Sequence, residues 1–256
     1  MKKIYICIDL KSFFASCECS KRNLDPFTTN LVVADKTRGE NALCLAITPA
    51  MKKLGIKNRC RTKDIPGDIP YTIAKPRMKM YMEYSAKIYG IYLRYVSSKD
   101  VHVYSIDECF IDITSYLKYY KKKPKEFADM LMSAVFEETG ITATVGIGTN
   151  LYLAKIAMDI IAKHVDDNIG MLTENTYRKY LWHYTPLTDF WHIGQGISNH
   201  LNRLGIYDMY DLAHYDQKKL YKEFGINAEY MIDHALGKEP TTIADIKAYA
   251  PKTNSL

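Results

Sequence analysis

Short apolar runs alternate with amphipathic stretches along the first two thirds of the chain. Runs rich in β-branched and aromatic residues predict strands at residues 3–10, 31–36, 42–48, 101–106, 109–113 and 142–148. Helical spacing of the apolar positions predicts helices at residues 12–21, 49–55, 76–96, 125–139 and 150–163. Beyond residue 164 the pattern is helical, in short pieces that are broken by proline and glycine.

This order of elements predicts the fold class. Strand, helix, paired strands, helix and strand in succession fit an α+β fold of the ferredoxin-like type, with residues 11–74 inserted after the first strand. In such a fold the first strand and the strand pair are neighbours in one sheet. The helix at 76–96 carries the stripe Tyr81, Tyr84, Ile88 and Tyr92, which we expect in the core.

Acidic residues interrupt these apolar strands. Asp107 and Glu108 lie between the paired strands, and Asp112 lies inside the second, although an unpaired buried carboxylate is costly. Asp9 ends the first strand, so Asp9, Asp107 and Glu108 would converge and could bind Mg²⁺ or Mn²⁺. The alternative, of equal weight on spacing alone, is a polar turn with Asp9 as a helix cap. Asp112 belongs to no such site, and we expect it to hydrogen-bond locally near Thr114.

Composition narrows the class of protein. Of the 256 residues, 47% are hydrophobic and 25% are charged, which is typical of a soluble globular protein. No apolar run approaches the roughly 20 residues that span a bilayer, and Asp9 interrupts any signal peptide. We therefore expect a cytoplasmic protein without membrane contact. The six cysteines form no C-x-x-C pair, so free thiols are predicted rather than disulfides or a zinc site.

Basic charge is concentrated in the N-terminal part of the chain. Residues 1–100 hold 19 Lys and Arg against 9 Asp and Glu, a net charge of +10, whereas the remainder carries −4. Residues 52–63 contain six cations and no acid. A solvated face is the usual explanation of such a run, and a site for nucleic acid or a nucleotide triphosphate is the alternative.

Four motifs resemble those of one family, in the same order. The segments are YSIDECFIDIT (104–114), CIDLKSFFASCE (7–18), GIGTNLYLAKIAMDIIAK (146–163) and FWHIGQGISNHLNRLGIYDMYDLA (190–213). They are similar to motifs of the Y-family, or translesion, DNA polymerases, in the UmuC- and DinB-like branch that includes ImpB, MucB and SamB. The first three motifs are specific, and together the four extend over nearly the whole chain.

The resemblance implies a domain organisation. Residues 1–10 and 75–163 would form a ferredoxin-like polymerase palm, 11–74 small fingers, and 164–237 a helical thumb with a helix-hairpin-helix near 188–213. Residues 238–256 would begin a linker to a little-finger domain that this chain lacks. We therefore expect a catalytic-core fragment whose DNA binding is weakened by lost phosphate contacts.

The resemblance also implies template-directed nucleotidyl transfer with two Mg²⁺ ions, for which Mn²⁺ can substitute. Asp9 and Asp107 would bridge both ions, Glu108 would bind the catalytic-side ion, and the carbonyl of Leu10 would complete the nucleotide-side ion. The catalytic residues would then be Asp107 and Glu108.

Further positions of the motifs match nucleotide-binding residues. Phe14 matches the aromatic steric gate beneath the sugar, and only one of Phe13 and Phe14 can face that sugar; the other reading of Phe14 is core packing. Lys155 matches the lysine that reaches the triphosphate and would otherwise be a solvated helix lysine. At the places of a Tyr and an Arg in many relatives, this chain has Pro49 and Lys52, so Lys52 can act only as a point charge.

The thumb motif implies DNA contact without base reading. Backbone amides near Ile193, Gly194, Gly196 and Ile197 would donate hydrogen bonds to a DNA phosphate. By themselves the two glycines are equally explained as helix caps.

The resemblance implies a monomer whose partners are primer–template DNA and deoxynucleoside triphosphates. A sliding clamp is a further candidate partner, through the absent C-terminal region. A nucleotide cyclase on a related palm is a competing hypothesis, but no G-G-D/E-E-F-like hairpin is present. A DNA-binding accessory protein with a decayed site is another, and the presence of Asp9, Asp107, Glu108 and Lys155 argues against it.

Overall fold

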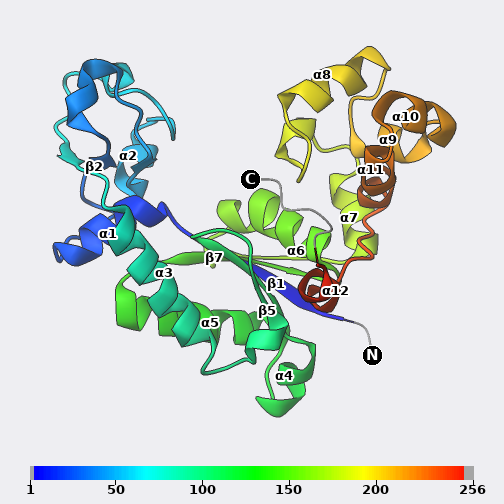
Figure 1. Ribbon diagram of the computed structural model, residues 1–256, viewed down its shortest axis with the longest axis horizontal. Helices are drawn as coiled ribbons and strands as arrows, with labels where there is room; N and C mark the ends of the chain where they lie inside the picture. The colour runs from blue at the N-terminus through cyan, green and yellow to red at the C-terminus, as the bar shows by residue number, and fades with distance from the viewer. Residues whose placement is uncertain (1–2, 251–256) are drawn as a thin grey trace.

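The computed structural model describes residues 3–250 and shows two lobes that rise on either side of a central sheet (Figure 1). The strands are β1 Tyr5–Leu10, β2 Leu31–Val33, β3 Ala46–Ile47, β4 Thr72–Ala74, β5 Val101–Val103, β6 Glu108–Asp112, β7 Ala143–Gly148 and β8 Ile169–Leu172. The α-helices are α1 Phe13–Lys21, α2 Pro49–Lys53, α3 Met78–Tyr92, α4 Thr114–Tyr119, α5 Pro124–Thr139, α6 Leu151–Ile156, α7 Glu174–Leu181, α8 Gln195–Arg203, α9 Met209–His214, α10 Gln217–Phe224, α11 Asn227–Ala235 and α12 Ile243–Ala248. No helix in this part of the chain is long and apolar enough to cross a membrane.

The central sheet has the strand order β5-β6-β1-β7-β8, with β7 and β8 parallel and all other neighbours antiparallel. The first strand therefore lies beside the strand pair, as predicted, and the α+β class is confirmed. Along β1, Ile6 and Ile8 enter the large core on one face, whereas Tyr5 and Cys7 pack on the other. Because strand side chains alternate with a period of two, Asp9 shares the face of Cys7.

Helices cover both faces of the central sheet. In Figure 1, α3 and α5 lie below the sheet and α6 lies above it. On α3 the side chains of Tyr81, Ile88 and Tyr92 are buried in the large core, and Tyr84 is half-buried against it. The predicted core stripe of this helix is thus confirmed, which leaves the α6 face of the sheet as the one that can present polar groups.

The two other lobes have apolar cores of their own. The small lobe, residues 22–74, contains α2 and the sheet β3-β2-β4 around a core that includes Val32, Ile47 and Met51. The helical lobe, residues 173–237, contains α7 to α11 around a second core, which also includes Tyr152, Leu153 and Ile156 of α6. After the helical lobe, α12 returns to the central sheet, where Ile243 is buried on the α6 face.

Several short segments differ from the predicted elements. The sequence did not predict β4, α4 or β8, and β8 lies where only helices were expected. The four residues of β8 become a strand by pairing with β7, which is a tertiary contact. The predicted strand 42–48 reduces to β3, and the strand predicted at 109 begins one residue earlier, at Glu108. The predicted linker 238–256 includes α12; its last residues, 251–256, lie outside the described part, as do residues 1–2.

Two predictions about single residue types are confirmed. As predicted, the carboxylate of Asp112 accepts a hydrogen bond from the nearby amide of Thr114, at 3.0 Å. Its ion pair with Lys3 at 2.6 Å joins residues 109 positions apart and was not predicted. All six cysteines are free thiols, and every one except the half-buried Cys60 is buried.

Candidate active site

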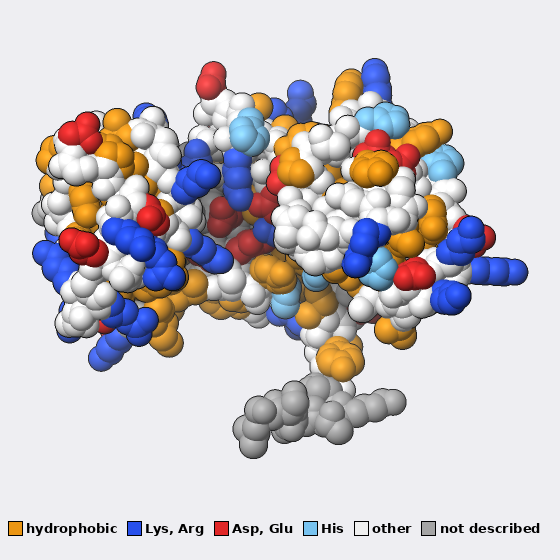
Figure 2. All heavy atoms as spheres, turned by 90° about the horizontal axis from the view of Figure 1, so that it is seen from above, with side chains coloured by type: hydrophobic (Ala, Val, Ile, Leu, Met, Phe, Trp, Pro, Cys, Tyr) orange, Lys and Arg blue, Asp and Glu red, His pale blue; other side chains and the backbone are white. Residues whose placement is uncertain are grey.

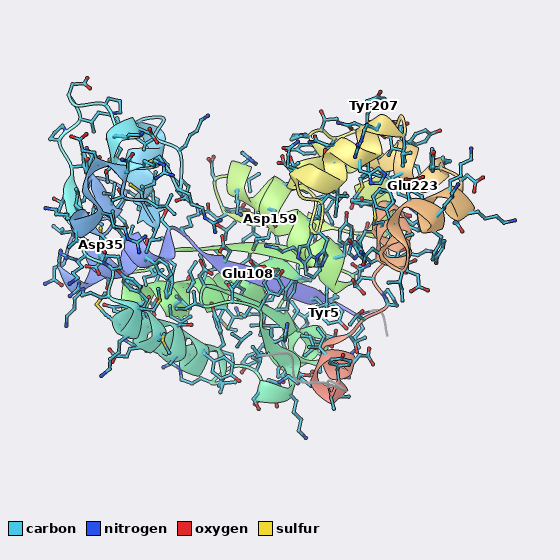
Figure 3. All side chains as sticks on the ribbon, turned by 45° about the horizontal axis from the view of Figure 1, so that its top comes forward. Tyr5, Asp35, Glu108, Asp159, Tyr207 and Glu223 are labelled. Atoms are coloured by element: carbon cyan, nitrogen blue, oxygen red, sulfur yellow. The ribbon has the colours of Figure 1, made fainter. Side chains whose placement is uncertain are left out.

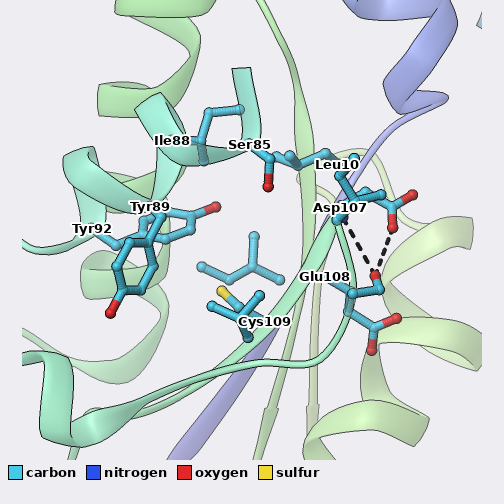
Figure 4. A pocket seen from close by; sticks show the side chains of 12 residues that line it. Leu10, Ser85, Ile88, Tyr89, Tyr92, Asp107, Glu108 and Cys109 are labelled. Carbon is cyan, nitrogen blue, oxygen red and sulfur yellow. Dashed lines mark hydrogen bonds between the residues drawn. The ribbon is translucent and has the colours of Figure 1, made fainter. Parts of the chain in front are cut away.

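Asp9 and Glu108 face each other across β1 and β6. Their Cα atoms are register partners in the antiparallel pairing, so both side chains lie on the same face of the sheet. Asp107 precedes Glu108 in the turn, and its carbonyl oxygen accepts a hydrogen bond from the amide of Leu10 at 3.0 Å. The Oγ of Ser105 donates to the carboxylate of Asp107 at 2.7 Å (dashed lines in Figure 4). These contacts bring Asp9, Leu10, Asp107 and Glu108 together.

Burial, together with the neighbouring charges, raises the pKa of Asp9. Burial raises the pKa of Asp9 from 3.8 to about 6; the nearby ammonium of Lys163 opposes this rise, and the charges of Asp107 and Glu108 add to it. The carboxylate of Asp9 is therefore short of compensating positive charge.

Glu108 is paired with a cation from α6. The Nζ of Lys155 lies 2.9 Å from the carboxylate of Glu108 and 2.9 Å from that of Asp159. The thiol of Cys7 donates a further hydrogen bond to Glu108 at 3.1 Å. Burial by itself lowers the pKa of Lys155, but the anionic surroundings raise it overall. Figure 3 shows Glu108 on the sheet and Asp159 on the helical segment above it, so the lysine joins the two layers.

Two glycines of β7 allow α6 to lie directly on the sheet. A Cβ atom at Gly146 would lie 2.0 Å from the carbonyl oxygen of Ala154, and one at Gly148 would lie 2.1 Å from the amide nitrogen of Ala154. Both distances are far below van der Waals contact, so no side chain fits at either position. This close approach places Lys155, the next residue of α6, within reach of Glu108.

The two adjacent aromatics at the start of α1 have different surroundings. Phe13 is buried in the large core, whereas Phe14 is half-exposed and stacks on Tyr81 with ring centroids 4.6 Å apart. The hydroxyl of Tyr81 donates to the buried carboxylate of Glu18 at 2.8 Å. Of the pair, Phe14 is thus the side chain that a ligand can contact.

Lys52 extends from the exposed side of α2 in the small lobe. Partial burial of its ammonium lowers the pKa of Lys52; the charge of Asp9 opposes this, and Lys163 and Lys11 add to it. Lys52 is therefore within electrostatic reach of Asp9. Figure 2 shows the intervening hollow between the small and helical lobes, with acidic and basic side chains gathered on its floor. Pro49 begins α2 and has no side-chain donor to offer.

Sequence reasoning missed Asp159 and Lys163. The Nζ of Lys163 lies 2.7 Å from the carboxylate of Asp159 and 3.8 Å from that of Asp9. Both residues belong to the motif at 146–163, at successive four-residue steps from Lys155. Such i,i+4 spacing of opposite charges was the available signal.

The predicted DNA-binding residues lie apart from the carboxylates, in the helical lobe (Figure 1). Gly194 is the N-cap of α8 and Gly196 lies in its first turn, with open space where either glycine would carry a Cβ. Ile193 is buried and Ile197 is half-buried. The first amides of a helix have no intrahelical acceptor, so those of residues 195–197 are donors for a ligand at this end.

The carboxylates do not form a ready-made metal site. Within residues 3–250, no three His, Cys, Asp or Glu side chains are grouped to hold an ion. The carboxylate of Glu108 is instead engaged by Lys155. The candidate ligands, which are the carboxylates of Asp9, Asp107 and Glu108 and the carbonyl of Leu10, nevertheless all offer oxygen atoms, and Mg²⁺ and Mn²⁺ prefer oxygen ligands. A bound cation would also offset the repulsion between the three carboxylates.

Comparisons with known proteins place the chain among relatives. Residues 8–159 match the model of the impB/mucB/samB family. UvrX of Bacillus subtilis, a protein named for UV-damage repair, is 36% identical over 237 residues, which cover 92% of this chain and 56% of that protein. DNA polymerase IV 2 of the same organism is 32% identical, over 90% of this chain and 55% of the relative. The chain thus spans about half the length of the curated relatives that it matches.

Solved structures share the fold. A Y-family DNA polymerase chimera matches with a TM-score of 0.81 at 24% identity, over 94% of this chain and 69% of that one. DinB from Sulfolobus solfataricus matches with a TM-score of 0.72 at 24% identity, over 97% and 68%. At this level of identity the likeness establishes the arrangement of the elements and leaves the chemistry to be argued from the residues.

Proposed function

We propose, because the chain belongs to the impB/mucB/samB family of Y-family DNA polymerases, that it is a template-directed DNA polymerase for damage bypass. The observation that carries the proposal is the grouping of Asp9, Asp107 and Glu108 at one end of the sheet, beneath Lys155. All four residues lie within the part of the chain that matches the family model.

We assign the lobes accordingly. Residues 1–10 and 75–163, which supply β1, β5, β6 and β7 of the central sheet, would be a ferredoxin-like palm, and β8 at Ile169–Leu172 completes that sheet from beyond this range. Residues 11–74 would be the fingers and residues 164–237 the thumb. The apolar core around Val32, Ile47 and Met51 supports a separate fingers unit, since a lobe with its own core can move as a unit. The core of the helical lobe also includes Tyr152 and Ile156 of α6, so the thumb would be joined to the palm through that helix.

The carboxylates would hold two Mg²⁺ ions, or Mn²⁺ in their place. Asp9 and Asp107 would bridge both ions, with Glu108 on one and the carbonyl of Leu10 on the other. The ions would supply charge stabilisation for the attacking and leaving oxygens of a phosphoryl transfer. The raised pKa of Asp9 supports this assignment, because an adjacent cation would return it toward its ordinary value.

Lys155 would exchange partners when substrate binds. Its ammonium contacts Glu108, and a carboxylate held by an ammonium is a poorer metal ligand. The incoming triphosphate is a polyanion, which would draw Lys155 away and free Glu108. Lys52 would add a second positive charge from the fingers, as a point charge without the fork of an arginine.

The reaction needs no protein nucleophile. The 3′-hydroxyl oxygen of the primer forms a bond to the α-phosphorus of a deoxynucleoside triphosphate, the bond to the β-phosphate oxygen breaks, and pyrophosphate leaves. The residues of this chain would position the reactants and stabilise developing charge. Phe14 would contact the sugar and exclude a 2′-hydroxyl, with Phe13 buried as its support in the core.

DNA would be held mainly through its phosphates. We assign the amides around Ile193, Gly194, Gly196 and Ile197 to a helix-hairpin-helix formed by α8 and α9. The partners would be primer–template DNA and deoxynucleoside triphosphates, bound to a monomer.

Primer extension with Mg²⁺ at low salt tests the proposal. The unmodified chain should extend a primer, and Asp107→Ala should abolish extension while the fold survives. Asp129→Ala removes the same charge from the exposed side of α5 and should extend normally. Extension by the Asp107→Ala variant at the rate of the control would show that the carboxylates are not the reaction centre.

A further inference from the structure

Aromatic side chains join the helical lobe to the central sheet. Trp191 lies in the loop before α8, and its indole Nε1 donates a hydrogen bond to the hydroxyl of Tyr104 at 3.1 Å. The rings of Trp191 and Tyr104 meet edge to face, with centroids 5.7 Å apart, and the ring of Trp191 is tilted over that of Phe110 at 5.8 Å. Tyr104 and Phe110 are also edge to face, at 5.8 Å. These three rings, which we call the aromatic bridge, connect the two parts of the molecule.

Trp191 is held from both sides of this junction. Its half-buried ring packs against the core of the helical lobe and also against the smaller core on the α6 face of the sheet. The smaller core contains Cys7 and Phe110, which are register partners across β1 and β6. The next residue, His192, has a left-handed backbone with a φ of 68°, and Ile193 then turns into the core of the helical lobe.

The sheet side of the aromatic bridge leads to the candidate metal ligands. The backbone amides of Tyr104 and Ser105 both donate to the carbonyl oxygen of Glu108, at 3.0 Å each, and so close the turn that carries Asp107. The Oγ of Ser105 donates in turn to the carboxylate of Asp107. By the other route, the thiol of Cys7 donates to Glu108 at 3.1 Å. Each ring that the indole touches on the sheet is therefore linked to a carboxylate through one further residue.

The helical side of the aromatic bridge leads to the amides that we assign to DNA. Gly194, the N-cap of α8, is three residues after Trp191, and open space surrounds the Cβ positions of Gly194 and Gly196. The first amides of α8, those of residues 195–197, have no intrahelical acceptor. An anchor three residues away thus fixes where a DNA phosphate at this helix end lies relative to the carboxylates.

We propose that Trp191 is a positioning residue for nucleotidyl transfer, which holds the DNA-binding end of α8 in place against the carboxylate turn through Tyr104 and Phe110. The inference rests on the proposed polymerase function and gives a task to a side chain that this function leaves without one. A misplacement of about 1 Å can reduce turnover about 100-fold. Surface loops are the more mobile parts of a fold, so the loop before α8 needs such an anchor.

Single-turnover primer extension, with DNA and deoxynucleoside triphosphate saturating and below the melting temperature, tests the inference. Trp191→Phe keeps an aromatic ring and loses the indole donor, whereas Tyr104→Phe loses the acceptor. Each variant should lower the rate about threefold to fivefold. The double variant should lie within about twofold of either single variant, because both remove the same hydrogen bond. Trp191→Ala, which also removes the ring contacts, should lower the rate about 30-fold.

Trp182→Phe is the matched control. The indole Nε1 of Trp182 donates to the carbonyl oxygen of Ala235 at 2.8 Å, so this hydrogen bond lies wholly within the helical lobe. Its loss should lower the melting temperature and leave the single-turnover rate within about twofold of the unmodified chain. A rate loss in Trp182→Phe as large as that in Trp191→Phe would overturn the inference, because general destabilisation would then explain both.

The affinity for primer–template DNA, measured by fluorescence anisotropy, separates positioning from binding. Trp191→Phe should leave this affinity within about twofold, since the amides of α8 are unchanged. A loss of DNA affinity as large as the loss of rate would overturn the inference, and so would rate losses that add in the double variant.

Hydrogen exchange gives a measurement that needs no activity. The amides of the turn at residues 104–108 should exchange about threefold faster in Trp191→Phe than in the unmodified chain, and at an unchanged rate in Trp182→Phe. Unchanged exchange of this turn in Trp191→Phe would overturn the inference. If the exchange depends on Trp191 as expected and the unmodified chain still fails to extend a primer, that result counts against the proposed polymerase function alone.

Discussion

Replacing Gly146 by alanine should disturb both stability and activity, because one contact serves both. The new Cβ would lie 2.0 Å from the carbonyl oxygen of Ala154 and 2.2 Å from the amide nitrogen of Met158. These are backbone atoms of the covering helix and cannot turn aside. To restore a contact of 3.4 Å, α6 must withdraw by about 1.4 Å, the difference between 3.4 and 2.0 Å.

The size of the effect follows from that displacement. Overpacking a core typically costs about 1–3 kcal/mol, and a backbone clash belongs at the upper end, about 3 kcal/mol. For a chain of this length, about 3 kcal/mol lowers the melting temperature by about 6–12 °C. The same withdrawal stretches the 2.9 Å contact between Lys155 and Glu108 to about 4 Å, beyond hydrogen-bond range. A misplacement of about 1 Å can reduce turnover by about 100-fold.

Thermal melts followed by circular dichroism, and primer extension below the melting temperature, measure the two effects. Gly90→Ala is the matched control, since Gly90 lies on the exposed side of α3 with no atom within 4 Å of its added Cβ. Alanine in a helix interior is favoured over glycine by up to about 1 kcal/mol, so this control should melt slightly higher. A Gly146→Ala protein that melts within 1 °C of the unmodified chain would refute the packing argument.

Other residues give shorter tests. Phe14→Ala should admit ribonucleotides in primer extension, and unchanged sugar selectivity in this variant would show that the gate is misassigned. Phe13→Ala should instead lower the melting temperature. With metal chelated, Asp9→Asn should stabilise the protein at pH 7.5 by up to about 3 kcal/mol. The reason is that the pKa of Asp9 is raised to about 6, so ionising Asp9 costs the native state stability as pH rises from about 4 to about 6. That gain should vanish at about pH 2.5, where Asp9 is protonated in both states because this pH is below both pKa values, and a gain that persists there would contradict the assigned cause. Glu18→Gln should lower the free energy of unfolding by about 2 kcal/mol, measured by denaturant titration, since the buried carboxylate of Glu18 accepts hydrogen bonds from Arg22, Arg77 and Tyr81. An unchanged midpoint would mean that this network contributes little.

The parts of the site that sequence could predict are those that violate a local rule. A carboxylate inside an apolar run, such as Asp9 or Glu108, demands a partner, and the order of strands predicted which carboxylates would meet. β8 violates no such rule, since its pairing with β7 is visible only in three dimensions. Lys163 was missed for a related reason. On an ideal helix it would be rotated by about 80° from Lys155, and the π-type turn between them leaves no mark in apolar periodicity, so only the i,i+4 spacing of charges with Asp159 indicated it.

Asp112 and Glu108 lie on the same face of β6, yet only one of them has a partner that it can exchange. Asp112 is fixed by Lys3 and by the amide of Thr114, which belong to the fold and have nothing to replace them. Glu108 pairs with Lys155 where both side chains are 10% exposed, and a pair so desolvated contributes little net stability compared with apolar packing. Stability is therefore a poor reason for the chain to keep Lys155 and Glu108 there. The proposed function offers a better reason: each group would prefer a different charged partner when substrate arrives, phosphate for the lysine and a metal ion for the carboxylate, and the pair would hold both groups in position until they separate.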